Sequence, residues 1–223
     1  MDLDEGRTLA GRFTGRVNGG VPVQGTLAGR QGGAEIRIRS DDAGAVLRDA
    51  GLFRDVVGGT LQLDLLPGGG RGLYDGTIRV AGPRLRNAPA LAELLSAISV
   101  VGLVEQVQGQ GIPFDEVSAD FRLSPNRITL YRSSAIGNSL GLSMDGIFNP
   151  RTGTMDMQGV VSPIYVLNRV GSVLTRRGEG LFGVNFTLRG PVRDPVVGVN
   201  PLSLLTPGVF REIFRRPPPQ RGN

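Results

Sequence analysis

Apolar and polar residues alternate with a period of two along several segments of the chain. The stretch AEIRIRS (Ala34 to Ser40) puts Ile36 and Ile38 on one face and arginines on the other. The same alternation runs through GTLQLDL, YDGTIRV, VSADFRLSPNRITLYRS, SLGLSMDGIFNPRTGTMDMQGVV and GLFGVNFTLRG. This period is typical of strands in a sheet with one apolar and one wet face.

The segments between these strands are turn sequences. Ser124-Pro125-Asn126 and the stretch from Asn149 to Gly153 separate alternating runs, so the flanking strands should be antiparallel neighbours. Gly76 and Gly146 each follow an aspartate inside a strand pattern. A glycine in that position marks a bulge or bend, which would help to curve the sheet.

Four segments have helical signals. Ser40 and Asp41 can cap DDAGAVLRDAGLFRDV, and Ala88 to Gln108 has apolar residues at helical spacing with Gly102 as a break. Ser162 and Pro163 can open a third helix. Thr206 and Pro207 can open a fourth, whose apolar face holds Val209, Phe210, Ile213 and Phe214 and whose cations are Arg211, Arg215 and Arg216.

These elements predict a mainly β fold. We expect a single curved, mostly antiparallel sheet that forms a U-shaped groove, with several short amphipathic helices packed at its face and end. Residues 1–216 should form one domain, and residues 217–223 a disordered tail rich in proline and arginine.

Composition excludes several kinds of chemistry. Among the 223 residues there is no Cys, His, Trp or Lys, so the usual zinc sites, Ser-His-Asp triads and thiol nucleophiles cannot form within the chain. We expect no metal, no cofactor and no catalytic residue. The net charge of +5 comes from arginines spread along the chain, which does not favour a nucleic-acid partner.

Motifs for catalysis or nucleotide binding are weak. GEGLFG (Gly178 to Gly183) precedes a predicted strand, whereas a dinucleotide site needs it to open a helix. The glycine-rich LPGGGRGLYDG lacks the lysine of a phosphate loop and predicts a hairpin loop. The carboxylate pairs Asp115 with Glu116 and Asp145 with Asp156 lie in exposed patterns without a sign of a pocket. We therefore expect a protein that is not an enzyme.

No secretion signal or membrane span is evident in this sequence. The first five residues contain three acids, and the longest nearly apolar run, Leu94 to Val104, is too short to span a bilayer. The alternation itself leaves two interpretations open. The apolar face can be an ordinary core, or part of it can line a groove for acyl chains.

The order of segments resembles the C-terminal region of the AsmA-like family, which includes AsmA, TamB and YhdP-type bacterial envelope proteins. Three stretches carry the resemblance: Ala88 to Leu123 with its G-x-G-I-x-F motif, Ile128 to Pro163, and Gly178 to Phe214 with VNPLS-x-L-x-PG-x-x-R-x-I-F.

The resemblance implies a module of a periplasmic, bridge-like lipid-transfer protein that moves phospholipid between the inner and outer membranes. It implies an inner-membrane anchor, which is not in this chain. Phospholipids are the expected partner, and other envelope proteins are further candidates. The rival hypothesis is a structural or assembly module that binds another envelope protein and carries no lipid.

On this interpretation the apolar faces of the strands line the groove. The candidate residues are Leu61, Leu63, Ile78, Val80, Phe121, Leu123, Ile128, Leu130, Leu140, Leu142, Met155, Met157, Phe182, Val184 and Phe186. The C-terminal helix would either cover the end of the sheet or contact a membrane surface, with its arginines meeting anionic head groups.

Overall fold

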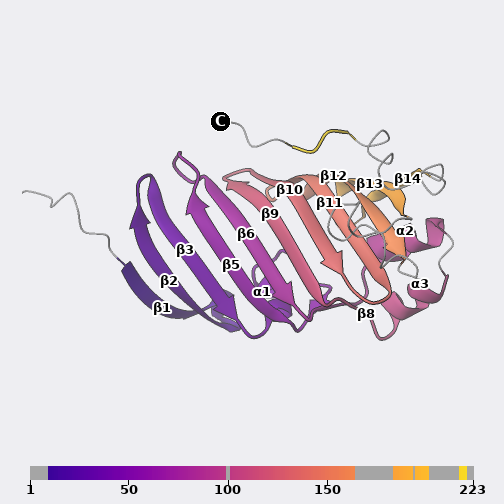
Figure 1. The fold of residues 1–223 in the computed structure, drawn as a ribbon, viewed down its shortest axis with the longest axis horizontal. Coiled ribbons are helices and arrows are strands. Elements are labelled where there is room, and N and C mark those ends of the chain that lie inside the picture. The colour runs from indigo at the N-terminus through magenta and orange to yellow at the C-terminus, as the bar shows by residue number, and fades with distance from the viewer. Residues whose placement is uncertain (1–9, 99–100, 164–182, 193, 201–215, 220–223) are drawn as a thin grey trace, which may run out of the picture.

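Eleven strands form one open antiparallel sheet whose order follows the sequence (Figure 1). The structure, a computed structural model, describes residues 10–98, 101–163, 183–192, 194–200 and 216–219. The strands are β1 (Ala10–Arg16), β2 (Pro22–Arg30), β3 (Gly33–Ser40), β5 (Thr60–Pro67), β6 (Tyr74–Ala81), β9 (Glu116–Ser124), β10 (Arg127–Ile136), β11 (Leu140–Asn149), β12 (Thr154–Pro163), β13 (Val184–Pro191) and β14 (Val196–Asn200). The predicted fold class, a single curved antiparallel sheet with short helices, is confirmed.

The strand register gathers apolar residues on one face of this sheet. Directly paired residues of antiparallel strands point to the same side. One such row runs Leu61, Val80, Val117, Ala135, Leu142, Val161 and Val184 across seven consecutive strands. The alternate residues are mostly polar, such as Gln62, Arg79 and Ser118. The two faces therefore differ in polarity along almost the whole sheet.

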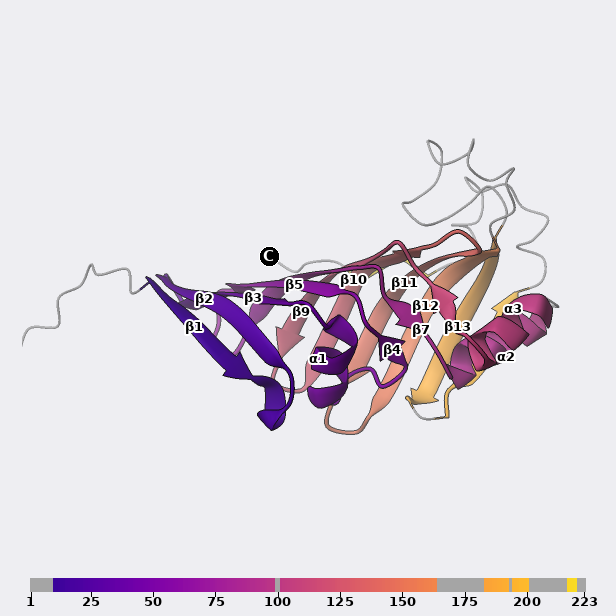
Figure 2. The same ribbon diagram turned by 90° about the horizontal axis from the view of Figure 1, so that it is seen from below.

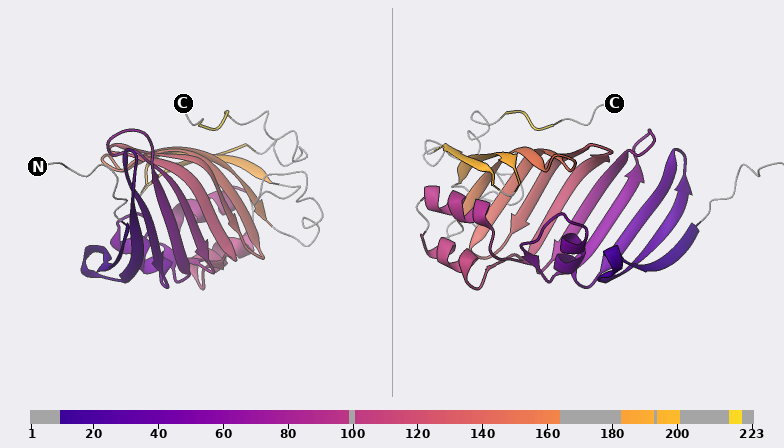
Figure 3. Two further views of the ribbon diagram at one scale, coloured as in Figure 1. Left: turned by 60° about the vertical axis from the view of Figure 1, so that its left-hand side comes forward. Right: turned by 180° about the vertical axis from the view of Figure 1, so that it is seen from behind.

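The sheet is curved, and the helices lie on its concave side (Figures 2 and 3). They are α1 (Ala43–Asp49), α2 (Pro89–Ala97) and α3 (Val101–Gln108), with a 3-10 turn η1 (Val17–Gly19) after β1. A three-stranded sheet of β4 (Val56–Val57), β7 (Arg84–Leu85) and β8 (Ile112–Pro113) joins them along the lower edge in Figure 1. The apolar face is the concave one, because residues of these helices pack against it.

Helix α1 begins where three contacts satisfy its first N–H groups. The Asp42 carboxylate accepts a hydrogen bond from the Ala45 N–H at 2.9 Å, as an N-cap does. The N–H groups of Ala43 and Gly44 donate to the carbonyls of Gly59 and Gly58 at 2.7 and 3.0 Å. Ala43 and Val46 pack with Val23, Leu61 and Val80 in the smaller of two buried clusters.

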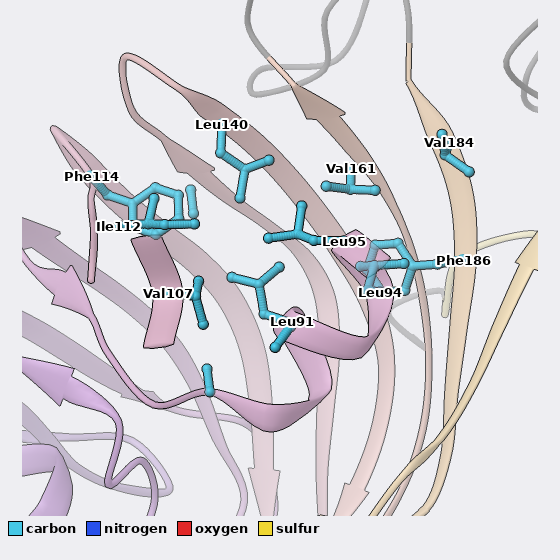
Figure 4. Packing of buried hydrophobic residues seen from close by; sticks show 13 residues of the cluster. Leu91, Leu94, Leu95, Val107, Ile112, Phe114, Leu140, Val161, Val184 and Phe186 are labelled. Atoms are coloured by element: carbon cyan, nitrogen blue, oxygen red, sulfur yellow. The ribbon is translucent and has the colours of Figure 1, made fainter. Parts of the chain in front are cut away.

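Helix α2 buries one side on the last strands of the sheet. Leu91, Leu94 and Leu95 recur at helical spacing and are 7%, 2% and 0% exposed. Figure 4 shows them facing side chains from β11, β12 and β13, with Val107 of α3 beside them. Together with Ile112, Phe114, Leu140, Val161, Val184 and Phe186 they form the larger buried cluster.

Several predicted details of the helices are wrong. The cap of α1 is Asp42 rather than Ser40 or Asp41, and the helix ends at Asp49. The segment expected to break at Gly102 is two helices, and Gly102 lies inside the second. Ser162 and Pro163 belong to the end of strand β12, and the rest of the helix expected after them lies outside the described residues. The predicted C-terminal helix lies outside the described residues.

The predicted turns are confirmed, and a bulge is found beside one of the two glycines expected to mark one. Ser124 to Arg127 and Asn149 to Thr154 connect hydrogen-bonded neighbours. Gly76 keeps a regular register with both neighbouring strands and marks no bulge, whereas Gly146 pairs with Leu130 at the point where the register between β10 and β11 shifts. The extra residue itself is in β10, where Leu130 pairs with Phe121 and Arg132 pairs with Asp120, which leaves Tyr131 without a partner position on β9.

Replacing Leu95 by Ala should lower the free energy of unfolding by about 2–5 kcal/mol, because a fully buried leucine leaves a cavity behind it. Urea denaturation followed by circular dichroism measures this loss. Leu66→Ala is the control, since Leu66 lies on the other face of β5 and is 47% exposed. Equal effects of the two changes would contradict the packing of α2 on the sheet.

Candidate functional site

Part of the concave face is covered by neither buried cluster. We call these apolar side chains the open floor. They lie on strands β2 to β12 and comprise Leu27, Ile36, Leu63, Leu65, Phe121, Leu123, Ile128, Leu130, Phe148 and Met155. Leu27 is 39% exposed and the others are partly buried. The helices cover the lower row of the face, so the open floor occupies the rows nearer the upper edge of Figure 1.

The polar residue in the middle of this face is satisfied by the sheet itself. Ser133 pairs with Ala119 and Met144 on the neighbouring strands, which places it on the concave side. Its hydroxyl donates a hydrogen bond to the carbonyl of Met144 at 2.9 Å. Ser133 therefore adds no unsatisfied polar group to an otherwise apolar surface.

Aromatic rings lie over glycines of the neighbouring strand at three places on the concave face. A Cβ atom added at any of these glycines would overlap the ring. The directly paired residues are Phe13 with Gly25, Phe121 with Gly76, and Phe186 with Gly159. The rings fill the space that a side chain would otherwise occupy, which shields the exposed backbone and keeps the surface level.

The described residues among those predicted to line the groove lie on one face, but some are uncovered and others are buried under the helices. Leu63, Phe121, Leu123, Ile128, Leu130 and Met155 belong to the open floor. Leu61, Val80, Leu140, Val184 and Phe186 are buried in the two clusters, and Ile78 and Leu142 pack against them. Those side chains form the core beneath the helices. Met157 is 7% exposed, and Phe182 lies outside the described residues.

Four open-floor residues were absent from the predicted groove: Leu27, Ile36, Leu65 and Phe148. The signal for three of them is in the sequence. Ile36 and Leu65 continue the alternation of their strands, and Phe148 continues the series Leu140, Leu142, Met144 through Gly146. Leu27 lies in a strand that contains two glycines and alternates poorly.

The convex face is held together by ion pairs between strands. Arg122 on β9 donates two hydrogen bonds of 2.9 Å to Asp75 on β6, and this contact raises the pKa of Arg122. Glu35 on β3 accepts hydrogen bonds from Arg30 at the end of β2 and from Arg37 on its own strand, and both lower the pKa of its carboxyl. Such pairs contribute modestly to stability, and opposite charges on neighbouring strands favour the observed register.

Arg216 is bound to the convex face of β12. The side-chain amide of Gln158 accepts a hydrogen bond from the Arg216 N–H at 3.0 Å and donates one to the Arg216 carbonyl at 2.7 Å. The Gln158 amide also donates to Asp145 at 2.9 Å, and both of these side chains are buried. The Arg216 guanidinium donates two further hydrogen bonds, of 2.9 and 2.7 Å, to Asp156.

These contacts place Arg216 on the side of the sheet opposite the helices. The sequence grouped Arg216 with a terminal helix that either covers the sheet end or meets a membrane. The other residues of that group, Val209, Phe210, Arg211, Ile213, Phe214 and Arg215, lie outside the described residues. Of the tail expected to be disordered, Pro217–Pro219 are described, and Pro218 and Pro219 are partly buried.

The two hydrogen bonds from Arg216 hold the pKa of the Asp156 carboxyl below its ordinary value. Partial burial of the carboxyl opposes this shift, and Arg189 on β13 adds to it with a hydrogen bond of 3.3 Å. The same contact raises the pKa of Arg216. Asp145 and Asp156, weighed above as a carboxylate pair, thus take part in holding the C-terminal segment.

Two further findings concern the described part of the chain. No helix there is long and apolar enough to cross a membrane. No group of three or more His, Cys, Asp or Glu residues is arranged there to hold a metal ion.

In comparisons with known proteins, no family model, no curated protein and no solved structure matches this chain. The resemblance to the AsmA-like family therefore stays a prediction from the sequence.

The contact between Arg216 and Asp156 should open in acid. The pKa of Asp156 is lowered while the segment is bound, so the contact is stabilised above the ordinary aspartate pKa of about 3.9 and is lost as the pH falls through the lowered value. Because the chain has no cysteine, spin labels at Thr154→Cys and Pro219→Cys can report the distance by electron paramagnetic resonance. We expect a narrow distance distribution at pH 7 that broadens below about pH 4.

Asp156→Asn keeps the shape of the side chain and removes its charge, so it should broaden the distribution already at pH 7. Arg127→Gln removes an exposed arginine elsewhere and should leave the distribution narrow. A narrow distribution in Asp156→Asn at pH 7 would show that this ion pair does not hold the segment.

Proposed function

We propose that the protein is a non-catalytic lipid-binding module that carries phospholipid acyl chains along the open floor. One observation carries the proposal: the concave face has a continuous apolar surface that helices α1, α2 and α3 leave uncovered among the described residues, and the paired charged side chains lie on the opposite face. Large exposed apolar surfaces are rare on soluble proteins unless they bind a partner or ligand.

The dimensions of the open floor suit an acyl chain. It spans eight consecutive strands of the sheet, from β2 to β12, which corresponds to roughly 34 Å at the usual strand spacing. The hydrocarbon core of a bilayer is about 30 Å thick, so one leaflet contributes about half of that. The floor is therefore longer than one acyl chain and could hold a chain in several positions along the sheet.

Binding of this kind needs no specific polar contact. Each buried CH₂ group contributes about 0.8 kcal/mol, so an apolar surface holds lipid tails of differing structure. The level surface formed by the ring-over-glycine pairs, such as Phe121 on Gly76, offers few obstacles to a chain that moves from strand to strand. We infer broad tolerance of the acyl chain.

The wider setting is proposed from the family resemblance. The module would belong to a bridge-like protein that is anchored in the inner membrane, extends through the periplasm and passes phospholipid to the outer membrane. This role would support the lipid balance of the outer membrane, and no catalytic group on the protein is required for it.

The alternative is a structural or assembly module of the cell envelope. The observation that favours it is the pair of clusters that cover the lower row of the concave face, as an ordinary core does. On this alternative the open floor is the contact surface for another envelope protein. Leu142 cannot separate the two functions, because it packs against the larger cluster and its replacement would disturb folding.

The double change Leu65→Gln with Leu123→Gln should abolish most lipid binding, because it puts two amides on the open floor. Titration of the purified protein with a fluorescent phospholipid should show a loss of affinity of about tenfold for each residue. Native mass spectrometry of the wild type should show co-purified phospholipid.

Leu66→Gln is the matched control, since it makes the same change on the convex face of β5 and should leave the affinity unchanged. Circular dichroism checks that all variants are folded. A folded wild-type protein that binds no phospholipid would exclude lipid transfer and favour the structural module.

A further inference from the structure

Four hairpins at the upper edge of the sheet carry one arginine each. The β2–β3, β5–β6, β9–β10 and β11–β12 connections all lie at this edge, as the register requires (Figure 1). Their arginines are Arg30, Arg71, Arg127 and Arg151, and all four are exposed. These four connections, residues 30–33, 67–73, 124–127 and 149–153, contain no acidic residue, whereas the β13–β14 connection at the same edge carries Asp194. We call these four hairpins the cationic rim.

Hydrogen bonds fix the backbone of these hairpins. The side-chain oxygen of Asn149 accepts from the N–H groups of Arg151 and Thr152 at 3.0 and 3.3 Å. The Ser124 hydroxyl donates to the carbonyl of Arg127 at 2.9 Å. In the glycine-rich connection, the Gly68 N–H donates to the Leu73 carbonyl at 2.8 Å. The arginines therefore project from ordered turns.

Three of the rim arginines differ from those of the convex face. Arg122, Arg132 and Arg189 on the convex face are each paired with an aspartate. Arg30 is likewise paired with Glu35. By contrast, Arg71, Arg127 and Arg151 have no ion-pair partner among the residues that the structure describes. Their charge is available to an external anion.

The cationic rim borders the open floor directly. Leu123 pairs with Ile128 one step below the β9–β10 turn, and Phe148 pairs with Met155 one step below the β11–β12 turn. At the opposite edge of the face, the helices and the three-stranded sheet cover the lower row (Figure 3). A chain lying on the floor can therefore leave its polar end in water at the rim.

We propose that the cationic rim binds the phosphate of anionic phospholipids whose acyl chains lie on the open floor. This inference rests on the proposed lipid-binding function and adds a preference for negatively charged head groups. Successive hairpins of the β9–β12 region are two strands, or about 10 Å, apart, so each arginine can meet a separate head group. The guanidinium group forms two parallel hydrogen bonds with phosphate, which suits this contact.

The experiment compares two fluorescent lipids that differ in net charge, phosphatidylglycerol and phosphatidylcholine, on the full chain. The wild type should bind phosphatidylglycerol more tightly, and the preference should shrink as salt is added. The triple change Arg71→Gln, Arg127→Gln and Arg151→Gln should weaken phosphatidylglycerol binding by about fivefold per arginine. Binding of phosphatidylcholine should change little.

A matched control removes the same charge elsewhere. Arg39, Arg54 and Arg86 are exposed and lie away from the four hairpins, so their joint replacement by Gln should leave the lipid preference intact. If both triple variants lose phosphatidylglycerol affinity equally, the cationic rim has no specific role and the preference reflects the overall charge of the protein.

The remaining outcomes separate this inference from the proposed function. If the wild type binds both lipids equally well, the rim has no role in selection and only this inference falls. If the wild type binds neither lipid, the lipid-binding function falls with it. Retention of a nucleic acid by the wild type, lost in the rim variant while lipid binding is unchanged, would reassign the arginines to another partner.

Discussion

The register of the antiparallel strands is the constraint on which the rest of the molecule depends. The apolar side chains of the concave face share that face because the strands are aligned in this register, and a slip of one residue would exchange the two faces. The bulge at Tyr131 shows that the faces are kept apart even where one strand has an extra residue. Leu130 and Ser133 are three residues apart, yet the bulge at Tyr131 returns both to the concave face and keeps Arg132 beside Asp120 on the convex face.

The strands and their connections could be predicted from the sequence because both signals are local. Period-two alternation identifies the strands, and Pro125 and Pro150 lie in the turns between them. The position at which α1 begins depends partly on residues far from it in sequence. Ser40, Asp41 and Asp42 can all cap a helix, and Asp42 is the residue that does so. The first N–H groups of the helix also donate hydrogen bonds to Gly58 and Gly59, which are distant in sequence.

The division of the apolar face into core and open floor could not be predicted. Leu61 and Leu65 lie on the same face of one strand, yet α1 buries the first and leaves the second uncovered. That difference depends on where a helix packs, and periodicity carries no information about it. The contact between Arg216 and Asp156 could not be predicted either, because 60 residues separate the two in sequence.

The rings that lie over glycines couple the amino acids at paired positions. At Gly76 and Phe121 the sheet has room for one large side chain shared between two strands. The quantity that the fold conserves there is the sum of the two volumes, since interiors tolerate exchanges that keep volume better than those that change it. Such a pair can exchange its members, or drift together to two residues of middling size, without altering the height of the surface above it.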